Sequence, residues 1–282
     1  MNLLIKLIGL RLNIASLLNP SRVGKMGLEY FGNPGKTNVN QKHLAFFKTS
    51  EKSDFQFEGH KVQVYRWGNG PAKILFLHGW QSHTYRWKRY VESLDKDRFT
   101  MYSIDGLSHG LSGGTYFNVA MFGQLIREFI ILYGKMDFVV GHSMGCFSAL
   151  NVFYHFPELT PKAAVLLAPP GEASLFFRDF MKRAGLTRRT SALLELNFKK
   201  LYGEPVTDFS ASRYASTLKI PGLIIHDIDD DDTSIDNARS IHDRWKNSKL
   251  IETQGFGHNL RSEEVVSFVY QFLMSFQITQ AK

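Results

Sequence analysis

From residue 55 onward, short apolar runs alternate with longer stretches in which apolar residues recur every three or four positions. The run 73–78 (KILFLH) is typical of a strand buried on both faces. Comparable runs lie at 99–104, 137–140, 163–167, 223–225 and, more weakly, 249–252. Helical patterns separate them at 85–94, 117–133, 144–156, 235–245 and 263–276. This alternation, preceded by a hairpin at 55–67, predicts a mostly parallel sheet with helices on both faces.

The first residues follow a helical pattern. Five apolar side chains recur at spacings of four and three: Leu3, Leu7, Leu10, Ile14 and Leu17. We expect an amphipathic helix that docks on the domain through this stripe, with a weak membrane-surface anchor as the alternative. Lys6 and Arg11 interrupt the apolar stretch, and we expect neither a membrane span nor a signal peptide. Residues 21–54, rich in Gly, Asn, Lys and Ser, are expected to be loop with short helical pieces.

The βα alternation fails between residues 169 and 218. This stretch has helical periodicity and no strand, and it is too long for an ordinary connection. We expect a helical cap over a site, with a merely decorative hairpin as the alternative. The predicted organisation is an extension at 1–54, a core formed by 55–168 and 219–282, and a cap at 169–218.

Composition narrows the classes of protein that fit. Hydrophobic residues make up 44% of the 282 residues and charged residues 21%, which indicates a packed globular core. The single cysteine, Cys146, excludes an intrachain disulfide and fits a reducing compartment, so we expect a cytoplasmic protein. The net charge of +8 resides in 1–54 and 169–218, and no nucleic-acid-binding signature accompanies it. We therefore expect no nucleic-acid partner.

The pattern G-x-S-x-G occurs three times, at 106–110, 110–114 and 141–145. A nucleophilic serine needs a tight turn between a strand and a helix, where its hydroxyl projects above the sheet. Ser108 leads into Leu-Ser-Gly-Gly, which cannot start a helix, and Ser112 has no strand directly before it. Only Ser143 follows a predicted strand and precedes a predicted helix, so it is the candidate nucleophile.

A serine nucleophile requires a histidine base that a carboxylate orients. His258 lies on a Gly-flanked loop after the last strand, whereas we expect His142 to point away from the turn and His78 and His226 to be structural. Carboxylates crowd the loop after 223–226: Asp227, Asp229, Asp230, Asp231 and Asp232. This run lacks the spacing of an EF-hand calcium loop.

Five segments together resemble the α/β-hydrolase superfamily over about residues 55–282. They are the oxyanion-type loop LHGW at 77–80, the loop DGLSHGLS at 105–112, the elbow GHSMG at 141–145, HDIDD at 226–230 and FGH at 256–258. The second of these is similar to the family pattern D-x-x-G-H-G-x-S, with Ser108 in the place of its first glycine. The order Ser…Asp…His is that of this superfamily. The resemblance implies the α/β-hydrolase fold with a helical cap, and it explains the other two serine matches as structural turns.

The resemblance also implies residue roles. It selects Asp230 as the triad acid, with Asp229 as a rival because Asp227 stands where the family pattern has glycine. The oxyanion hole would consist of the backbone N–H groups of Trp80 and Met144.

These residues predict a serine hydrolase that cleaves short-to-medium-chain carboxylic esters of small molecules through an acyl-enzyme, with no cofactor and no metal. The cap would supply an apolar pocket formed by Phe176, Phe177, Phe180, Met181, Leu194 and Phe198. The same triad acting on lactones, thioesters or carbon–carbon bonds, or as an acyltransferase, is the alternative. A non-catalytic membrane-surface protein is the alternative from another class, and the oligomeric state stays open.

Overall fold

The structure, a computed structural model, describes the backbone of residues 2–280 and the side chains of residues 3–276. The chain divides into two compact units. The sheet unit comprises residues 34–171 and 211–282, and the helical unit comprises residues 1–33 and 172–210.

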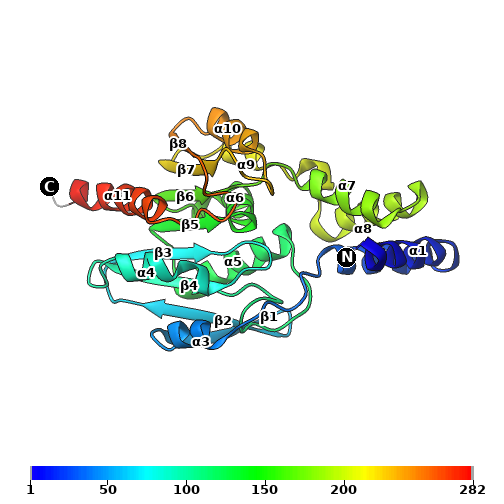
Figure 1. The fold of residues 1–282 in the computed structure, drawn as a ribbon, viewed down its shortest axis with the longest axis horizontal. Coiled ribbons are helices and arrows are strands. Elements are labelled where there is room, and N and C mark those ends of the chain that lie inside the picture. The colour runs from blue at the N-terminus through cyan, green and yellow to red at the C-terminus, as the bar shows by residue number, and fades with distance from the viewer. Residues whose placement is uncertain (1, 281–282) are drawn as a thin grey trace. The chain divides into compact units, whose positions relative to one another are not determined.

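One eight-stranded sheet organises the sheet unit (Figure 1). Its strands are β1 (Glu51–Phe57), β2 (His60–Trp67), β3 (Ala72–Leu77), β4 (Phe99–Ile104), β5 (Phe138–His142), β6 (Ala163–Leu167), β7 (Gly222–Asp227) and β8 (Ser248–Thr253). The spatial order is β1-β2-β4-β3-β5-β6-β7-β8. Only the β1–β2 and β2–β4 pairs are antiparallel. This confirms the predicted mostly parallel sheet of an α/β-hydrolase fold.

Helices cover the two faces of this sheet. One face carries α3 (Gln41–Phe47), η1 (Thr84–Trp87), α4 (Lys88–Ser93) and α11 (Glu263–Gln280). The other helices of the unit are α5 (Val119–Tyr133), α6 (Met144–His155), η2 (Pro157–Leu159), α9 (Ala211–Ala215) and α10 (Ile235–Arg244). Of these, α6 packs on β3 and β5 and also against α5. Strands β4, β5, β6 and β7 are therefore shielded from water on both sides, as their continuous apolar runs predict, whereas the edge strand β8 is partly exposed.

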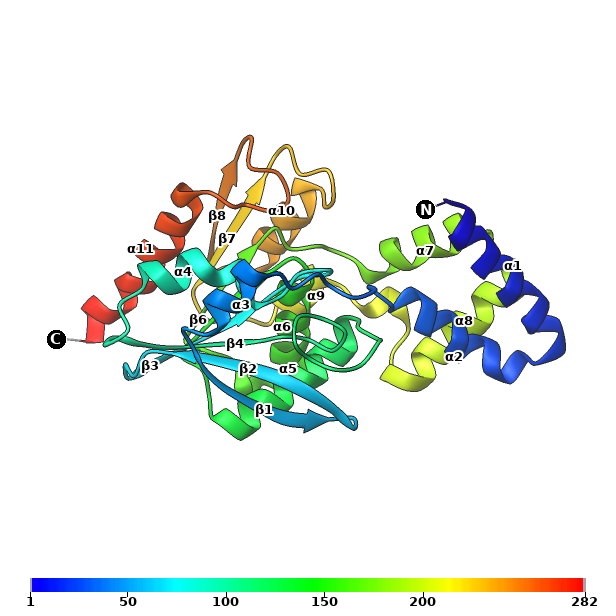
Figure 2. The same ribbon diagram turned by 60° about the horizontal axis from the view of Figure 1, so that its bottom comes forward.

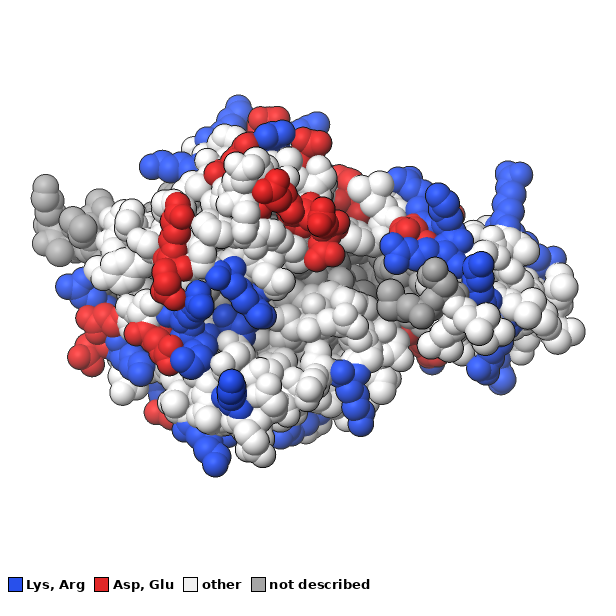
Figure 3. All heavy atoms as spheres, viewed as in Figure 1, with Lys and Arg blue, Asp and Glu red and all other residues white. Residues whose placement is uncertain are grey.

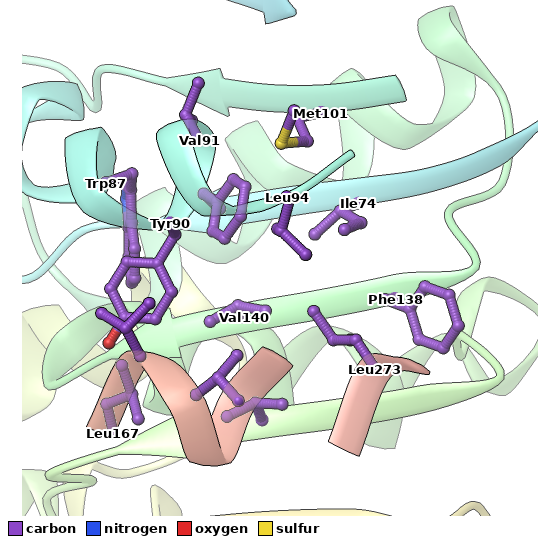
Figure 4. Packing of buried hydrophobic residues seen from close by; sticks show 14 of the residues in the cluster. Ile74, Trp87, Tyr90, Val91, Leu94, Met101, Phe138, Val140, Leu167 and Leu273 are labelled. Atoms are coloured by element: carbon purple, nitrogen blue, oxygen red, sulfur yellow. The ribbon is translucent and has the colours of Figure 1, made fainter. Parts of the chain in front are cut away.

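Side-chain alternation along β3 shows how one strand supplies both faces. Ile74 and Phe76 join the cluster that holds Trp87, Tyr90 and Leu273 (Figure 4). Leu75 and Leu77 point the opposite way because successive residues of a strand face opposite sides. These four side chains of β3, from Ile74 to Leu77, are completely buried.

The helical unit consists of α1 (Asn2–Leu18), α2 (Pro20–Phe31), α7 (Ala173–Ala184), α8 (Arg188–Tyr202) and η3 (Val206–Asp208) (Figure 2). Its core is aromatic: the Phe177 ring meets Phe31 edge-on at 5.0 Å, and Phe198 meets Phe209 at 5.1 Å. An isolated bridge between Glu172 and Ser210 joins the two ends of the inserted segment. The first helices and the insertion thus share one core.

Two expectations for the first 54 residues need correction. Residues 21–54 are not mainly loop, because α2 and α3 occupy much of them and β1 begins at Glu51. Two of the glycines that suggested a loop, Gly24 and Gly27, are packing positions in α2: a Cβ on Gly27 would lie 2.6 Å from the Leu194 side chain, so α2 approaches α8 closely. Residues 34–54 belong to the sheet unit. The helical insertion is 172–210 rather than 169–218, because α9 packs on α6 and α10 of the sheet unit.

The orientation of α1 also differs from the expectation. The helix forms, but it docks on the other helices of the helical unit through Gly9, Leu12 and Ser16, which are buried. The predicted docking stripe, which begins at Leu3 and ends at Leu17, is exposed instead. Both sides of α1 are apolar, and apolar periodicity alone did not identify the side that packs.

Candidate active site

Ser143 occupies a sharp turn between β5 and α6. Its backbone has φ 50° and ψ −121°, a left-handed conformation that costs free energy in a residue other than glycine. Small neighbours permit the turn: a Cβ on Gly145 would lie 2.3 Å from the Leu77 carbonyl oxygen. The side chain is only partly buried. This is the geometry that exposes a serine hydroxyl above a sheet.

The loop after β3 lies directly against this turn. A Cβ on Gly79 would approach the Ser143 Cβ to 2.9 Å, so a larger residue could not stand there. Trp80 follows Gly79, and Met144 is the first residue of α6, where backbone N–H groups have no partner within the helix. The loop after β3 and the first backbone N–H groups of α6 therefore lie beside Ser143. The positive end of the α6 dipole favours negative charge there.

Asp230 is the carboxylate that contacts His258. Its Oδ2 lies 2.8 Å from His258 Nδ1, and the Asp230 side chain is completely buried. Asp229 Oδ2 instead accepts a hydrogen bond from the Gly255 N–H at 3.2 Å. Asp227 accepts from Thr253 and Phe256. The structure therefore brings Asp230, and not its rival Asp229, to the histidine.

A dense set of donors surrounds the Asp230 carboxylate. Oδ1 accepts from the N–H groups of Asp232 at 2.9 Å and Thr233 at 2.8 Å. Oδ2 accepts from the Thr233 hydroxyl at 3.0 Å and lies 3.1 Å from His226 Nε2. Burial alone would raise the pKa of Asp230, but hydrogen bonds from His226, His258 and the Thr233 N–H hold that pKa well below its usual range. A charged carboxylate thus faces His258 Nδ1, which donates and leaves Nε2 as the basic nitrogen.

Two residues around Asp230 were not predicted to take part. His226, which we expected to be purely structural, contacts Asp230 and also donates from Nε2 to the Thr233 carbonyl at 2.9 Å. Thr233 closes the turn of the carboxylate loop. The motif HDIDD includes His226 but gives it no role, and it ends before Thr233, because both roles depend on how the loop folds back.

His142 and Arg86 hold the histidine loop. His142 Nε2 donates to the His258 carbonyl at 2.8 Å, although we expected its ring to point away from the turn. Burial, followed by the nearby Arg86 guanidinium, keeps the pKa of His142 well below its usual range, so the ring is neutral. Arg86 is partly buried and donates to the carbonyl of Asn259. The backbone of His258 is therefore fixed from the residue adjacent to Ser143.

The other two serine matches have different partners. Ser112 donates to the Asp105 carbonyl at 2.6 Å and accepts from the Gln63 N–H at 2.8 Å, which ties its loop to β2. Ser108 donates to the Gly35 carbonyl. Asp105 is buried and accepts from Tyr65, at 2.8 Å. These contacts make the segment a structural loop around Asp105.

Three of the six predicted pocket residues have a different role. Phe177, Leu194 and Phe198 are almost completely buried within the helical unit and form its core. Burial against their own unit corrects the expectation that they line a pocket. Phe180 also contacts Phe31, at 5.5 Å, whereas Phe176 is 44% exposed and Met181 is partly buried.

Cys146 is a buried thiol. Burial raises the pKa of the Cys146 thiol above its usual range, so it stays protonated and bonds to the Leu167 carbonyl. In the part of the chain that the structure describes, no group of three or more His, Cys, Asp or Glu side chains is arranged to hold a metal ion. Within the same residues, no helix combines the length and the apolar character needed to cross a bilayer.

Comparisons with known proteins place the chain near hydrolases. Residues 69–207 match the family described as serine aminopeptidase, S33. An uncharacterized protein of Mycobacterium tuberculosis is 32% identical over 104 residues, as is one of Mycobacterium bovis. That stretch covers 36% of this chain and spans only 30% of the relatives' length.

Solved structures share the fold at low sequence identity. An esterase of Pyrococcus furiosus aligns with a TM-score of 0.61 at 22% identity, over 86% of this chain and 96% of its own. A putative lipase of Acinetobacter baumannii has a TM-score of 0.65 at 16% identity, covering 87% and 100%. A structure described as a membrane phospholipase A and bacterial virulence factor has a TM-score of 0.65 at 16% identity, covering 96% and 98%. The chain therefore has the α/β-hydrolase fold, and the family match together with these neighbours supports its place in the α/β-hydrolase superfamily.

Proposed function

We propose that the protein is a serine hydrolase that cleaves carboxylic esters through an acyl-enzyme, with Ser143, His258 and Asp230 as its triad. The observation that carries the proposal is the buried contact between Asp230 and His258 at 2.8 Å. His258 lies on the loop after β8, and His142 ties that loop to the strained Ser143 turn. The hydrogen bonds from Asp232 and Thr233 offset the cost of burying this charge, and a carboxylate held in this way orients the imidazole ring.

The proposed reaction follows from these positions. Ser143 Oγ attacks the ester carbonyl while His258 Nε2 takes its proton, and Asp230 stabilises the imidazolium that results. The oxyanion of the tetrahedral intermediate accepts hydrogen bonds from the N–H groups of Trp80 and Met144. Collapse expels the alcohol, which receives the proton from His258. Water, activated by the same histidine, then releases the acid and restores the serine.

The chain length of the substrate is part of the proposal. The Trp80 ring lies 6.1 Å from Phe117 by ring centroids, which gives the oxyanion loop an apolar neighbour. Each additional methylene buried on such a surface contributes about 0.8 kcal/mol. We therefore expect acyl chains of a few carbons to be better substrates than acetyl, up to a limit set by the size of the site.

The printed descriptions of the structural neighbours are compatible with ester chemistry, since they name an esterase, a putative lipase and a phospholipase A. The matched family is described as an aminopeptidase, which places amides among the substrates to test. Fold by itself does not select among these bonds.

The test combines covalent labelling with a substrate panel. A fluorophosphonate should label the wild-type protein, and peptide mapping should place the adduct on Ser143. Ser143→Ala should lose both labelling and turnover while keeping its circular dichroism spectrum. Ser112→Ala and Ser108→Ala are the matched controls and should keep most of both.

The panel should comprise acetyl to dodecanoyl esters of one chromogenic alcohol, a lactone, a thioester and an aminoacyl anilide. We expect the highest kcat/KM on a short-to-medium ester. Labelling at Ser108 or Ser112 would overturn the nucleophile, and a preference for the anilide would overturn the ester class. A rate that rises steadily to the longest chain would overturn the chain-length limit.

A further inference from the structure

Helix α1 presents a continuous apolar face that nothing in the helical unit covers. Its centre is a row of five side chains that are each between 51% and 73% exposed: Leu3, Leu7, Leu10, Ile14 and Leu17. Leu4 and Leu18 widen the face and are 67% and 81% exposed. Large apolar side chains that stand together in this way mark an interaction surface, whereas isolated ones need no explanation.

The opposite side of α1 is committed to packing. Leu12 and Ser16 are buried, and Gly9 lies so close to α7 that a Cβ would meet the Ala184 carbonyl. Asn13 donates to the Gly185 carbonyl at 2.9 Å and accepts from the Thr187 N–H at 2.9 Å. The helix cannot rotate to bury its leucines without losing these contacts, so the exposed face belongs to the folded unit.

Cations border this face on both sides. Each residue of an α-helix is rotated by about 100° about the helix axis from the one before it. This rotation places Lys6 and Arg11 on opposite edges of the leucine row. Helix α1 contains no acidic residue. The helical unit has eleven Lys and Arg against six Asp and Glu, a net charge of +5 out of the chain's +8. Figure 3 shows these cations distributed over the surface of the helical unit.

The same charges argue against a second copy of the chain as the occupant. The leucine row has the heptad spacing of a coiled coil, and in a parallel pair Lys6 would face Arg11 of the other copy. With no acidic residue in α1, other alignments also lack an opposite charge for these cations. An apolar row between cations instead complements a surface that is negatively charged outside and apolar beneath.

The helix is also unsuited to crossing a bilayer. It has 17 residues, it carries two cations, and one of its sides is occupied by the other helices of its unit. A spanning helix needs about 20 predominantly apolar residues. Lying in the plane of the interface requires only one free apolar side, which α1 has.

We propose that α1 is a membrane-surface helix, which inserts its leucine row into an anionic lipid bilayer and places Lys6 and Arg11 at the level of the lipid phosphates. This binding is separate from the proposed catalysis, because none of these side chains belongs to the sheet unit that contains Ser143. Membrane binding and hydrolysis can therefore be tested independently.

The experiment is co-sedimentation of the full chain with vesicles. One set contains phosphatidylcholine with about 30 mol% phosphatidylglycerol, and the other contains phosphatidylcholine alone. The wild-type protein should partition onto the anionic vesicles, and raising NaCl from about 0.1 M to about 0.5 M should weaken binding. Leu7→Ser combined with Leu10→Ser should weaken binding to the vesicles about tenfold or more, because the variant lacks two of the leucines that insert into the bilayer.

A matched control separates this face from general hydrophobicity. Ile131 and Leu132 on α5 are 53% and 60% exposed, close to the 53% and 56% of Leu7 and Leu10. Ile131→Ser with Leu132→Ser should bind vesicles like the wild type. Lys6→Gln with Arg11→Gln should remove the preference for anionic lipid.

Three results would overturn the proposal. One is a wild-type protein that sediments with neither kind of vesicle. Another is a Leu7→Ser and Leu10→Ser variant that binds like the wild type although circular dichroism shows it folded. The third is a dimer, detected by analytical ultracentrifugation, that this variant alone abolishes, which would assign the face to a second copy.

Discussion

The sheet unit and the helical unit use their apolar residues in opposite ways. In the sheet unit, apolar runs such as Ile74–Leu77 of β3 are completely buried. In the helical unit, a core of aromatic and aliphatic side chains is buried while most of the leucines of α1 remain exposed. A strand between two helical layers has no free face, whereas a helix at the rim of a small bundle always has one. The same hydrophobicity therefore indicates burial in one unit and a surface in the other.

The two units also differ in the polar groups that they bury. Among the described residues, the sheet unit buries titratable side chains, including His78, Asp105, His226 and Asp227. The described polar residues that the helical unit buries are Ser16, Ser174 and Thr190, and all three carry a hydroxyl group. All ten histidines of the chain lie in the sheet unit. Chemistry and pH sensitivity should therefore reside in one unit, and packing and surface contacts in the other.

The largest expected effect concerns the acid of the sheet unit. Asp230→Asn should lower kcat by about 10⁴-fold, because His258 would lose the partner that sets its tautomer. The measurement is steady-state turnover of the best ester in the panel. Asp229→Asn and Asp231→Asn should retain most of the activity. If Asp229→Asn is instead the crippling change, the geometry that favours Asp230 does not reflect the working enzyme.

The next effect tests whether the helical unit has a core of its own. Phe177→Ala removes a completely buried ring and should destabilise that unit by about 3–5 kcal/mol. Hydrogen exchange should then accelerate in α1, α2, α7 and α8 while the strands keep their protection. Phe76→Ala, the counterpart in the sheet unit, should expose the strands. Equal acceleration of both units by Phe177→Ala would mean that they unfold as one.

A smaller effect is expected where α1 meets α7. Gly9→Ala places a methyl group against the Ala184 carbonyl and should cost about 1–3 kcal/mol of helical-unit stability. Thermal unfolding followed by circular dichroism measures this loss. Gly113→Ala is the control, because its Cβ would meet its nearest neighbours at an ordinary 3.5 Å. A Gly9→Ala variant as stable as the wild type would show that α1 does not pack as closely as described.

The most gradual effect, small over any single pH unit, is a pH dependence confined to the sheet unit. Burial lowers the pKa of His78 to about 3 and, aided by His78 itself, that of His109 to about 3. Both rings are neutral in the fold but take up a proton in the unfolded chain below a pH of about 6.5. Stability is therefore complete above that pH and falls by about 1 kcal/mol per histidine for each pH unit below it, down to about pH 3.

Urea unfolding at several pH values between neutral and mildly acidic would measure this slope. Hydrogen exchange should assign the acid-induced loss to the strands, because the helical unit contains no histidine. His109→Gln should reduce the slope. A stability that is independent of pH in this window would argue against neutral, buried rings.

Much of the sheet unit follows from local sequence patterns. The continuous apolar runs predict β3 to β7, and the strand–turn–helix context selects Ser143 from three matches. His258 is identified by its glycine-flanked loop after the last strand. Such features depend on residues close together in the chain, so they can be recognised without knowing the fold.

Tertiary structure decided the remainder, because it depends on partners distant in sequence. Asp230 rather than Asp229 contacts His258 since the N–H groups of Asp232 and Thr233 turn the Asp230 carboxylate inward. His142 reaches a carbonyl 116 residues away. Likewise, α1 had two apolar sides, and which one was buried depended on α7, more than 150 residues further along the chain. Hydrophobic periodicity identifies the side chains that favour burial, but the neighbour against which the helix packs determines which of them are buried.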